Sequence, residues 1–288
     1  MNISVMTVSF PLDVETMEEV KQLIAEAKTV DKADYTSLLS IAELTDFYTK
    51  GFCVLAYDDN SDQLVGVLTS IDRIATLDFE WSSVVLPSVR RLGIGERLVT
   101  ELVRNLELRA AAADIALTPE SSEAGKQLLH KFGYTYDFSE RTMVADAEKV
   151  ELNSEVEVSQ YSDEESEVVG VLVSAFGDTE EEAKELIAFN TQTPNRHLMI
   201  AKRQAEVVGT VTIVDDGEKL WVTGLAVHEN ARGKGVATYL LNWSKNEANR
   251  MERASVYLDV ETDNEQALSI YEKSGFTTVS NTHFYKKR

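Results

Sequence analysis

The stretch VLPSVRRLGIG occupies residues 85–95, and a related stretch, VHENARGKGVA, occupies residues 227–237. The two stretches are 142 positions apart, since 227 − 85 = 142. The same shift maps KFGY at 131–134 onto KSGF at 273–276. Two separate motifs in one register indicate a duplicated domain, because chance matches would not share an offset over this span. The sequence therefore predicts two tandem copies of one fold.

The segment 146–155 is charged, lacks aromatic residues and lies between two expected strands. We place the domain boundary there, which gives an N-terminal domain at 1–146 and a C-terminal domain at 155–288. The chain has 288 residues, 43% of them hydrophobic, which is enough to bury two cores of ordinary size.

Both copies are expected to hold strands and helices in the same order, as a mixed α/β fold with one strand–loop–helix unit in the middle. In the first copy, strands are expected at 5–10, 52–57, 64–71, 114–118 and 141–144, with another ending at 84–85, and helices at 15–28, 96–106 and 122–132. In the second copy, strands are expected at 156–158, 197–202, 207–214, 219–227, 256–260 and 282–286, and helices at 164–176 and 264–273. Gly209 matches Gly66 at an offset of 143 (209 − 66), a slip that we attribute to an indel in a surface loop.

Composition restricts the compartment and the partners. No run of about eighteen apolar residues could span a membrane, and residues 1–11 do not resemble a secretion signal. The single cysteine, Cys53, excludes an internal disulfide and suits a reducing cytoplasm. It lies in an apolar run, so we expect a buried structural thiol. No Cys/His cluster has metal-ligand spacing, so no metal is expected.

The net charge of −21 argues against nucleic acid, whose phosphates would be repelled. Two interpretations of the acidic excess stay open. It can be a surface that keeps the protein in solution, or a field that favours cationic substrates.

Each glycine-rich stretch joins an apolar strand to an amphipathic helix. Glycine permits a tight turn, and the first helical N–H groups have no partner within the helix. The helix dipole adds partial positive charge there, which favours a phosphate or diphosphate. Arg232 and Lys234 add full charges in the second copy, and Arg90 and Arg91 do so in the first. Neither stretch has the spacing of a nucleoside-triphosphate P-loop or of Gly-x-Gly-x-x-Gly.

These residues resemble a known family. The stretches at 85–95 and 227–237 are similar to the acyl-CoA loop of the GCN5-related N-acetyltransferases (GNAT), and NEQALSIYEKSGF at 264–276 is similar to their later motif. The resemblance covers nearly the whole chain as two tandem domains, an arrangement also found in mycothiol-synthase-like members. It implies two GNAT domains, each a mixed, mostly antiparallel sheet flanked by helices, and acetyl-CoA as the cofactor.

The resemblance also implies roles for individual residues. The loop amides of the second copy would hold the diphosphate of CoA, the end of the preceding strand would pair with the pantetheine arm, and Asn264 would contact that arm. These cofactor-binding residues are Arg232, Gly233, Lys234, Gly235, Val236 and Ala237 in the loop and Leu225, Ala226 and Val227 in the strand. Their counterparts in the first copy are Val85, Arg90, Arg91, Leu92, Gly93, Ile94 and Gly95.

Tyr271 is the candidate catalytic residue, because the resemblance places it near the thioester sulfur. A tyrosine hydroxyl can protonate or hydrogen-bond the departing thiolate. Its counterpart 142 positions earlier is Leu129, which cannot, while Asn264 maps to Ser122. Without the upstream loop, Tyr271 would be read as a core aromatic.

A group must also accept the proton of the attacking amine. The strand at 219–227 contains no carboxylate, and the sequence does not choose among Asp215, Glu218 and Asp259. His228 follows the strand, but we interpret it as structural.

The sequence thus predicts an N-acetyltransferase that moves an acetyl group from acetyl-CoA to an amine by direct attack, with the C-terminal domain catalytic and the N-terminal domain degenerate. A non-catalytic CoA-binding or regulatory module is the main alternative, and an active N-terminal domain that uses water as its proton donor is another. The acceptor, a small molecule or a peptide, and the oligomeric state stay open.

Overall fold

The computed structural model describes residues 2–31, 33–72, 76–152 and 155–287. The chain divides into two compact units: unit 1 comprises Met1–Glu140 with Ser280–Arg288, and unit 2 comprises Arg141–Val279. Relative to the domains expected from sequence, residues 141–146 lie in the second unit and 280–288 in the first. Residues 153–154 of the expected boundary segment lie outside the described residues.

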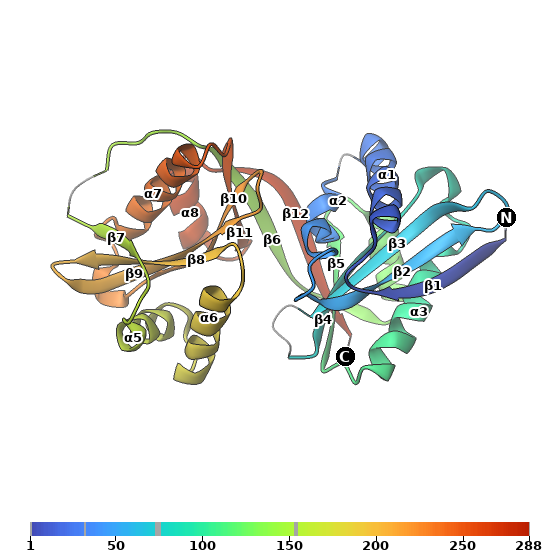
Figure 1. Cartoon of the computed structure of the whole chain (residues 1–288), viewed down its shortest axis with the longest axis horizontal. Helices are drawn as coiled ribbons and strands as arrows, with labels where there is room; N and C mark the ends of the chain where they lie inside the picture. The colour runs from blue at the N-terminus through green and yellow to red at the C-terminus, as the bar shows by residue number, and fades with distance from the viewer. Residues whose placement is uncertain (1, 32, 73–75, 153–154, 288) are drawn as a thin grey trace. The chain divides into compact units, whose positions relative to one another are not determined.

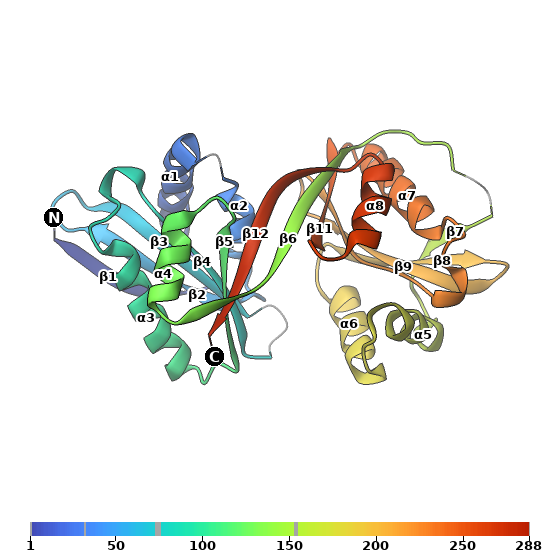
Figure 2. The ribbon, with the colours of Figure 1, turned by 180° about the vertical axis from the view of Figure 1, so that it is seen from behind.

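Unit 1 is a sheet with helices on both faces. Its strand order is β1 (Ile3–Ser9), β2 (Lys50–Asp58), β3 (Gln63–Asp72), β4 (Asp78–Val85), β5 (Ala113–Pro119) and β12 (Thr277–Lys287), where β12 contributes its residues from Ser280 on. All neighbours pair antiparallel except β4 and β5, which are parallel. Helix α1 (Val14–Asp31) and the short α2 (Tyr35–Leu38) lie on one face, and α3 (Ile94–Leu108) and α4 (Glu123–Lys131) on the other (Figures 1 and 2). The amphipathic α3 buries Ile94, Leu98 and Leu102 in the core of this unit.

Unit 2 repeats this plan. Its strand order is β6 (Tyr134–Asp146), β11 (Ser255–Glu261), β10 (Leu220–Val227), β9 (Glu206–Asp215), β8 (Arg196–Arg203) and β7 (Glu157–Gln160), where β6 contributes its residues from Arg141 on. Helices α5 (Glu165–Phe176) and α6 (Glu180–Gln192) cover one face, and α7 (Val236–Arg250) and α8 (Glu265–Lys273) the other. Sequence analysis missed α6, although its start carries a capping box in which Thr179 and Glu182 bond each other's backbone.

The duplicated α/β fold is confirmed by the bounds of the repeated elements. β4 and β10 begin 142 residues apart (220 − 78), as do α3 and α7 (236 − 94) and α4 and α8 (265 − 123). The short 3-10 turns Pro87–Val89 and Glu229–Ala231 keep the same offset (229 − 87).

Two strands differ from the expected assignment. The strand at 282–286, expected to close the second copy, pairs with β5 of unit 1, from Thr282 opposite Pro119 to Lys286 opposite Ile115. There Phe284 stacks on Phe138 with ring centroids 4.4 Å apart, and Tyr285 is buried in the core of unit 1. The strand at 141–144 lies in unit 2, whose core contains Met143. Alternating burial predicts a strand but does not show which strand it pairs with. The sequence therefore could not reveal that 282–286 lies in unit 1 and 141–144 in unit 2.

The attribution of the one-residue slip to a surface loop was wrong. Ser70 of β3 faces Trp81, and Thr212 of β9 faces Thr223, so Ser70 and Thr212 match at an offset of 142 (212 − 70). Gly66 of β3 faces Val85, and Gly209 of β9 faces Val227, so these two glycines match at an offset of 143. The slip therefore lies inside the paired strands, between Gly209 and Thr212. Its consequence is a β-bulge in β10, where the register jumps from Thr223 to Ala226.

Within the described part of the chain, no helix is long and apolar enough to cross a membrane. Cys53 is fully buried, as expected, and burial raises the pKa of its thiol.

Candidate functional site

The two glycine-rich loops adopt the same backbone conformation. Gly93 is the N-cap residue of α3, with φ +82°, and Gly235 is the N-cap residue of α7, with φ +79°. Both angles lie in the left-handed region that favours glycine. A Cβ atom at either position would meet nothing within 4 Å, so open space adjoins the start of each helix. Each loop can therefore present unpaired helical N–H groups to an anion.

The loop side chains divide into buried and exposed ones. Ile94 and Val236 are each 1% exposed, so they anchor the helices and leave only their backbone amides for a ligand. Leu92 is exposed, and so is Lys234, which occupies the same position in the second copy (234 − 92 = 142). A cation therefore stands in the loop of unit 2 where unit 1 has an apolar side chain.

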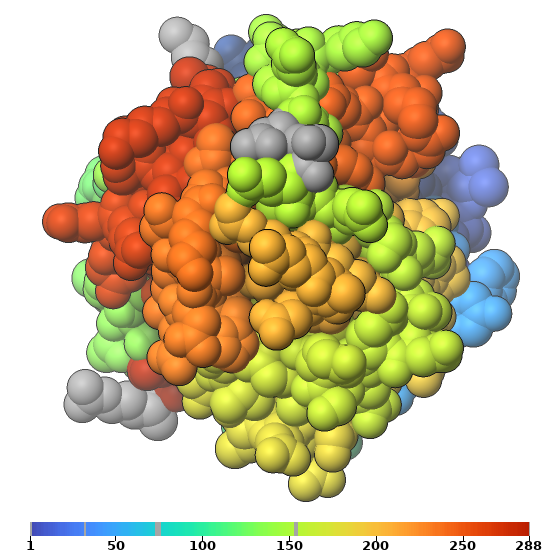
Figure 3. All heavy atoms as spheres, turned by 90° about the vertical axis from the view of Figure 1, so that its left-hand side faces the viewer, coloured from blue at the N-terminus to red at the C-terminus, as the bar shows by residue number. Residues whose placement is uncertain are grey.

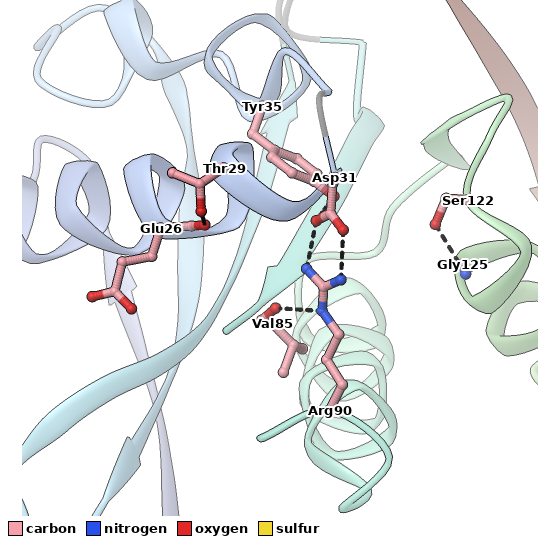
Figure 4. A network of polar contacts seen from close by, with 8 residues as sticks. All are labelled: Glu26, Thr29, Asp31, Tyr35, Val85, Arg90, Ser122 and Gly125. Atoms are coloured by element: carbon pink, nitrogen blue, oxygen red, sulfur yellow. Dashed lines mark hydrogen bonds and ion pairs between the residues drawn. The ribbon is translucent and has the colours of Figure 1, made fainter. Parts of the chain in front are cut away.

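Arg90 holds the loop of unit 1 to the rest of that unit (Figure 4). Its Nε donates to the Val85 carbonyl oxygen at 2.9 Å, and its two Nη atoms donate to the Asp31 carboxylate at 2.7 and 2.5 Å. These hydrogen bonds hold the pKa of Asp31 below its usual value. The charge of Arg90 is thus largely offset by Asp31, and the guanidinium ties the loop to the end of α1, whereas Arg91 is exposed.

Arg232 makes the corresponding link in unit 2 without a carboxylate. Its Nε donates to the Val227 carbonyl at 3.3 Å, and its Nη2 donates to the Ser174 carbonyl at 2.8 Å. The Glu229 amide donates to Ser174 Oγ at 3.0 Å, and Figure 3 shows the orange loop beside the yellow-green α5. Unit 2 therefore keeps a positively charged loop.

Unit 1 contains a cavity of 710 Å³ between its loop and the start of α4. β4 and β5 pair only from Asp78–Ala113 to Trp81–Ala116 and then part. The cavity lies where they part, because its lining includes Val85, Gly95, Pro119 and Ser122. Figure 4 shows Ser122, which caps α4 through the Gly125 amide at 3.2 Å, across from Arg90.

The corresponding strands of unit 2 also part, and here the bulge intervenes. β10 and β11 pair only at Leu220–Val256 and Trp221–Tyr257. Just beyond, Gly224 and Leu225 have no partner in the register with β9, and Gly224 has φ +55°. The bulge takes backbone groups out of the ladder at the point where the strands separate. In unit 1, the β3–β4 register is continuous from Gly66 to Ile71.

Tyr271 and Asn264 lie on α8 and at its start. Tyr271 is partly buried against Phe276, with ring centroids 6.2 Å apart, and burial raises the pKa of its hydroxyl. Asn264 caps α8, with Oδ1 accepting from the Ala267 amide at 3.0 Å. Leu129, the counterpart of Tyr271, is 3% exposed and belongs to the core of unit 1.

The geometry separates the three carboxylates left open by the sequence. Asp215 faces Leu220, at the end of β10 remote from the loop, and two hydrogen bonds from Arg253 lower the pKa of its carboxyl. Glu218 lies in the turn at that same end. Asp259 lies on β11 beyond its last pair with β10, where the strands have parted.

His228 has a structural hydrogen bond, as the sequence suggested: its Nδ1 accepts from the Asn230 amide at 3.3 Å, which caps the short 3-10 turn. Sequence analysis missed the bulge and the Asp31–Arg90 pair. The first had a signal in the offset of Gly209, whereas the second joins residues 59 positions apart and had none.

Comparison with known proteins agrees with this geometry. A model of the acetyltransferase (GNAT) family matches residues 17–134 and again residues 160–276, so the chain belongs to this family and carries its fold twice. The uncharacterized N-acetyltransferase YobR of Bacillus subtilis (strain 168) is 35% identical over 94 residues, which is 31% of this chain and 36% of that relative.

Two solved structures resemble the whole chain. A GCN5-related N-acetyltransferase from Sphaerobacter thermophilus superposes with a TM-score of 0.74 at 18% identity, covering 98% of this chain and 95% of the other. A tandem GNAT protein from the clavulanic acid biosynthesis pathway superposes with a TM-score of 0.72 at 14% identity, covering 98% of both chains. At these identities the likeness establishes the fold.

Proposed function

We propose that the protein is an acetyl-CoA-dependent N-acetyltransferase in which unit 2 catalyses direct attack of an amine on the thioester. One observation carries this proposal. Asp259 lies on β11, one of the two strands that part in unit 2 next to a bulge in β10, and Tyr271 lies on α8, which packs on the core of the same unit. The same positions in unit 1 are Leu129 and Leu117 (259 − 117 = 142), and the ladder there is regular.

The donor would bind along β10 and its loop. The amides of residues 232–237 would hold the diphosphate of CoA, with Lys234 supplying charge. The backbone of Leu225–Val227 would pair with the pantetheine arm, because β11 has left that edge. Asn264 uses its Oδ1 for the cap, so its amide nitrogen would be the group that contacts the arm.

The chemistry divides between the two faces of the sheet. Asp259 accepts the proton that the amine nitrogen loses as the new C–N bond forms. A bulge N–H donates to the carbonyl oxygen as negative charge develops there. Tyr271 donates a hydrogen bond to the sulfur as the C–S bond breaks, and burial raises the pKa of its hydroxyl, which favours the protonated form. The products are an acetylated amine and CoA thiol.

Release of CoA thiol from acetyl-CoA, measured with a panel of amines, tests this proposal. Asp259→Asn should lower kcat about 100-fold, which is the scale of general-base catalysis, and should leave acetyl-CoA affinity unchanged. Glu261→Gln is the matched control, because Glu261 is exposed two residues further along the same strand. Equal activity of wild type and Asp259→Asn would remove Asp259 from the mechanism.

The cavity of unit 1 supports a second, non-catalytic CoA site. Its lining includes Val85, Arg90, Arg91, Gly93, Ile94 and Gly95, and Leu92 lies in the same loop. Titration calorimetry with CoA should then give two sites per chain, one of which is lost in Gly93→Val. We also propose a cytoplasmic location, on the evidence of the single cysteine.

A further inference from the structure

A cation, Arg196, lies near the β10 bulge on the face of the unit 2 sheet that is covered by α5 and α6, not by α7 and α8. Arg196 pairs with Val214, Val214 with Trp221, and Trp221 with Tyr257. Residues directly opposite each other in neighbouring strands point to the same face. Leu198, two residues after Arg196, packs in the core beneath α5 and α6, so Arg196 lies on that side as well.

Contacts on three sides fix the Arg196 guanidinium. Its Nε donates to Asn190 Oδ1 at 2.9 Å, and its Nη2 donates to Thr223 Oγ1 at 3.2 Å. The guanidinium carbon lies 4.6 Å from the centre of the Phe189 ring. Asn190 is only 3% exposed, so the group that orients Arg196 is itself immobilised. The side chain therefore crosses β9 and ends at the residue that begins the bulge.

Asp259 lies on the same face, on the other side of Thr223. Tyr257 is paired with Trp221. Asp259 and Thr223 each lie two residues further along these parallel strands, so they lie side by side on the same face of the sheet. Val256, Leu258 and Val260 alternate with Asp259 and are buried against α7 and α8. Thr142 on β6 donates to Asp259 Oδ1 at 2.7 Å and fixes its carboxylate. A positive and a negative group thus flank Thr223 at the bulge.

Unit 1 lacks the carboxylate of this pair. Asp259 corresponds to Leu117. Arg196 corresponds to Lys50, because Arg196 faces Val214 and Lys50 faces Asp72, which are 142 positions apart (214 − 72). The repeated fold therefore forms without the carboxylate, and the pair of opposite charges occurs only in the unit that carries Tyr271.

We infer that the acceptor is an amine that also carries a carboxylate, of which a free α-amino acid is the simplest form. This inference rests on the proposed function of unit 2. The amino group would face Asp259. The carboxylate would accept hydrogen bonds from Arg196, whose guanidinium has five N–H donors in a planar arrangement that matches the two oxygens of a carboxylate. Neighbouring strands are about 4.8 Å apart, so charges on either side of β10 leave room for a molecule of this length.

The test compares free amino acids with their α-carboxamides, which keep the amine and lose the carboxylate. With acetyl-CoA as donor, we expect kcat/KM for the acids to exceed that for the carboxamides at least tenfold. Arg196→Gln should lower kcat/KM for the acids about 10- to 100-fold, the scale of a hydrogen bond to a charged group, and should change that for the carboxamides less than about threefold. Arg196→Lys should recover part of the preference.

Arg203→Gln is the matched control, because Arg203 ends the same strand in an ion pair with Glu155 and should leave both substrate sets unaffected. Calorimetric binding of acetyl-CoA verifies that each variant is folded. Turnover of both sets without a preference for the acids, or an equal loss of both in Arg196→Gln, overturns the inference alone. Absence of CoA release with every amine overturns the proposed function and this inference with it.

Discussion

Trp81 and Thr223 occupy the same rung of the two repeated sheets, but only Thr223 begins a β-bulge. Three residues separate Gly66 from Ser70 in β3, whereas two separate Gly209 from Thr212 in β9. The shorter segment between Gly209 and Thr212 leaves two residues of β10 opposite one of β9, which is the definition of a bulge. A difference of one residue in an interior strand therefore changes the backbone where an acyl group would bind.

Gly224 permits this bulge, because its φ of +55° is costly for any residue with a Cβ. Gly224→Ala should destabilise unit 2 by about 1 kcal/mol and lower kcat about tenfold, since the bulge amides would shift. Urea unfolding and steady-state CoA release measure the two effects. Gly217→Ala is the control, because Gly217 has φ +91° in the turn between β9 and β10 and should lose stability without losing kcat. Equal kcat in both variants would contradict the role of the bulge.

Tyr271→Phe removes the hydroxyl and keeps the ring that packs on Phe276. We expect kcat to fall about 100-fold with acetyl-CoA affinity unchanged, as for loss of a general acid. Single-turnover assays and calorimetry measure these quantities. Tyr239→Phe on α7 serves as the control for loss of a partly buried tyrosine hydroxyl. Full turnover in Tyr271→Phe would show that the sulfur obtains its proton elsewhere.

Much of this architecture could be predicted from the sequence, because local chemistry determines it. The loops before α3 and α7, the amphipathic faces of the helices and the 142-residue repeat all depend on neighbouring residues. The partner of 282–286 could not be predicted, since Phe284 and Tyr285 can bury against either sheet. The bond between Asp31 and Arg90 depends on tertiary folding for the same reason.

Within the site, the residue types of Tyr271 and Leu129 could be compared directly in the sequence. Choosing Asp259 over Asp215 required the register of β10, which shows that Asp215 lies at the remote end. The position of Arg196 beside Thr223 likewise required the paired strands, because its side chain reaches across β9. Chemistry that joins distant residues on one face of a sheet is therefore the part that sequence alone leaves open.

Glu164 gives unit 2 a specific sensitivity to acid. A hydrogen bond from Lys202 at 2.7 Å, followed by backbone amides, lowers the pKa of its carboxyl to about 2 from 4.5. A carboxyl whose folded pKa is depressed stabilises the native state above its unfolded pKa, and this contribution is lost as pH falls from 4.5 toward 2. Wild type should thus lose thermal stability over this window faster than Glu164→Gln. Glu165→Gln should follow wild type, and parallel curves for all three would contradict the assignment.

The C-terminal strand should be essential for unit 1. Deleting residues 280–288 removes the partner of β5 and exposes the edge at Ile115–Pro119. Hydrogen exchange should then accelerate at the β5 amides, while those of β8 and β9 in unit 2 stay protected. Unchanged protection of β5, or equal loss in both units, would contradict the division of the chain.

The most direct test of the account is acetyl-CoA-dependent CoA release by paired variants of the two loops. Valine at either glycine places a β-branched side chain at positive φ, where the diphosphate would bind. We predict that Gly235→Val lowers turnover at least about 100-fold, whereas Gly93→Val changes it less than about threefold. Loss of activity in Gly93→Val with activity retained in Gly235→Val would contradict the assignment of catalysis to unit 2.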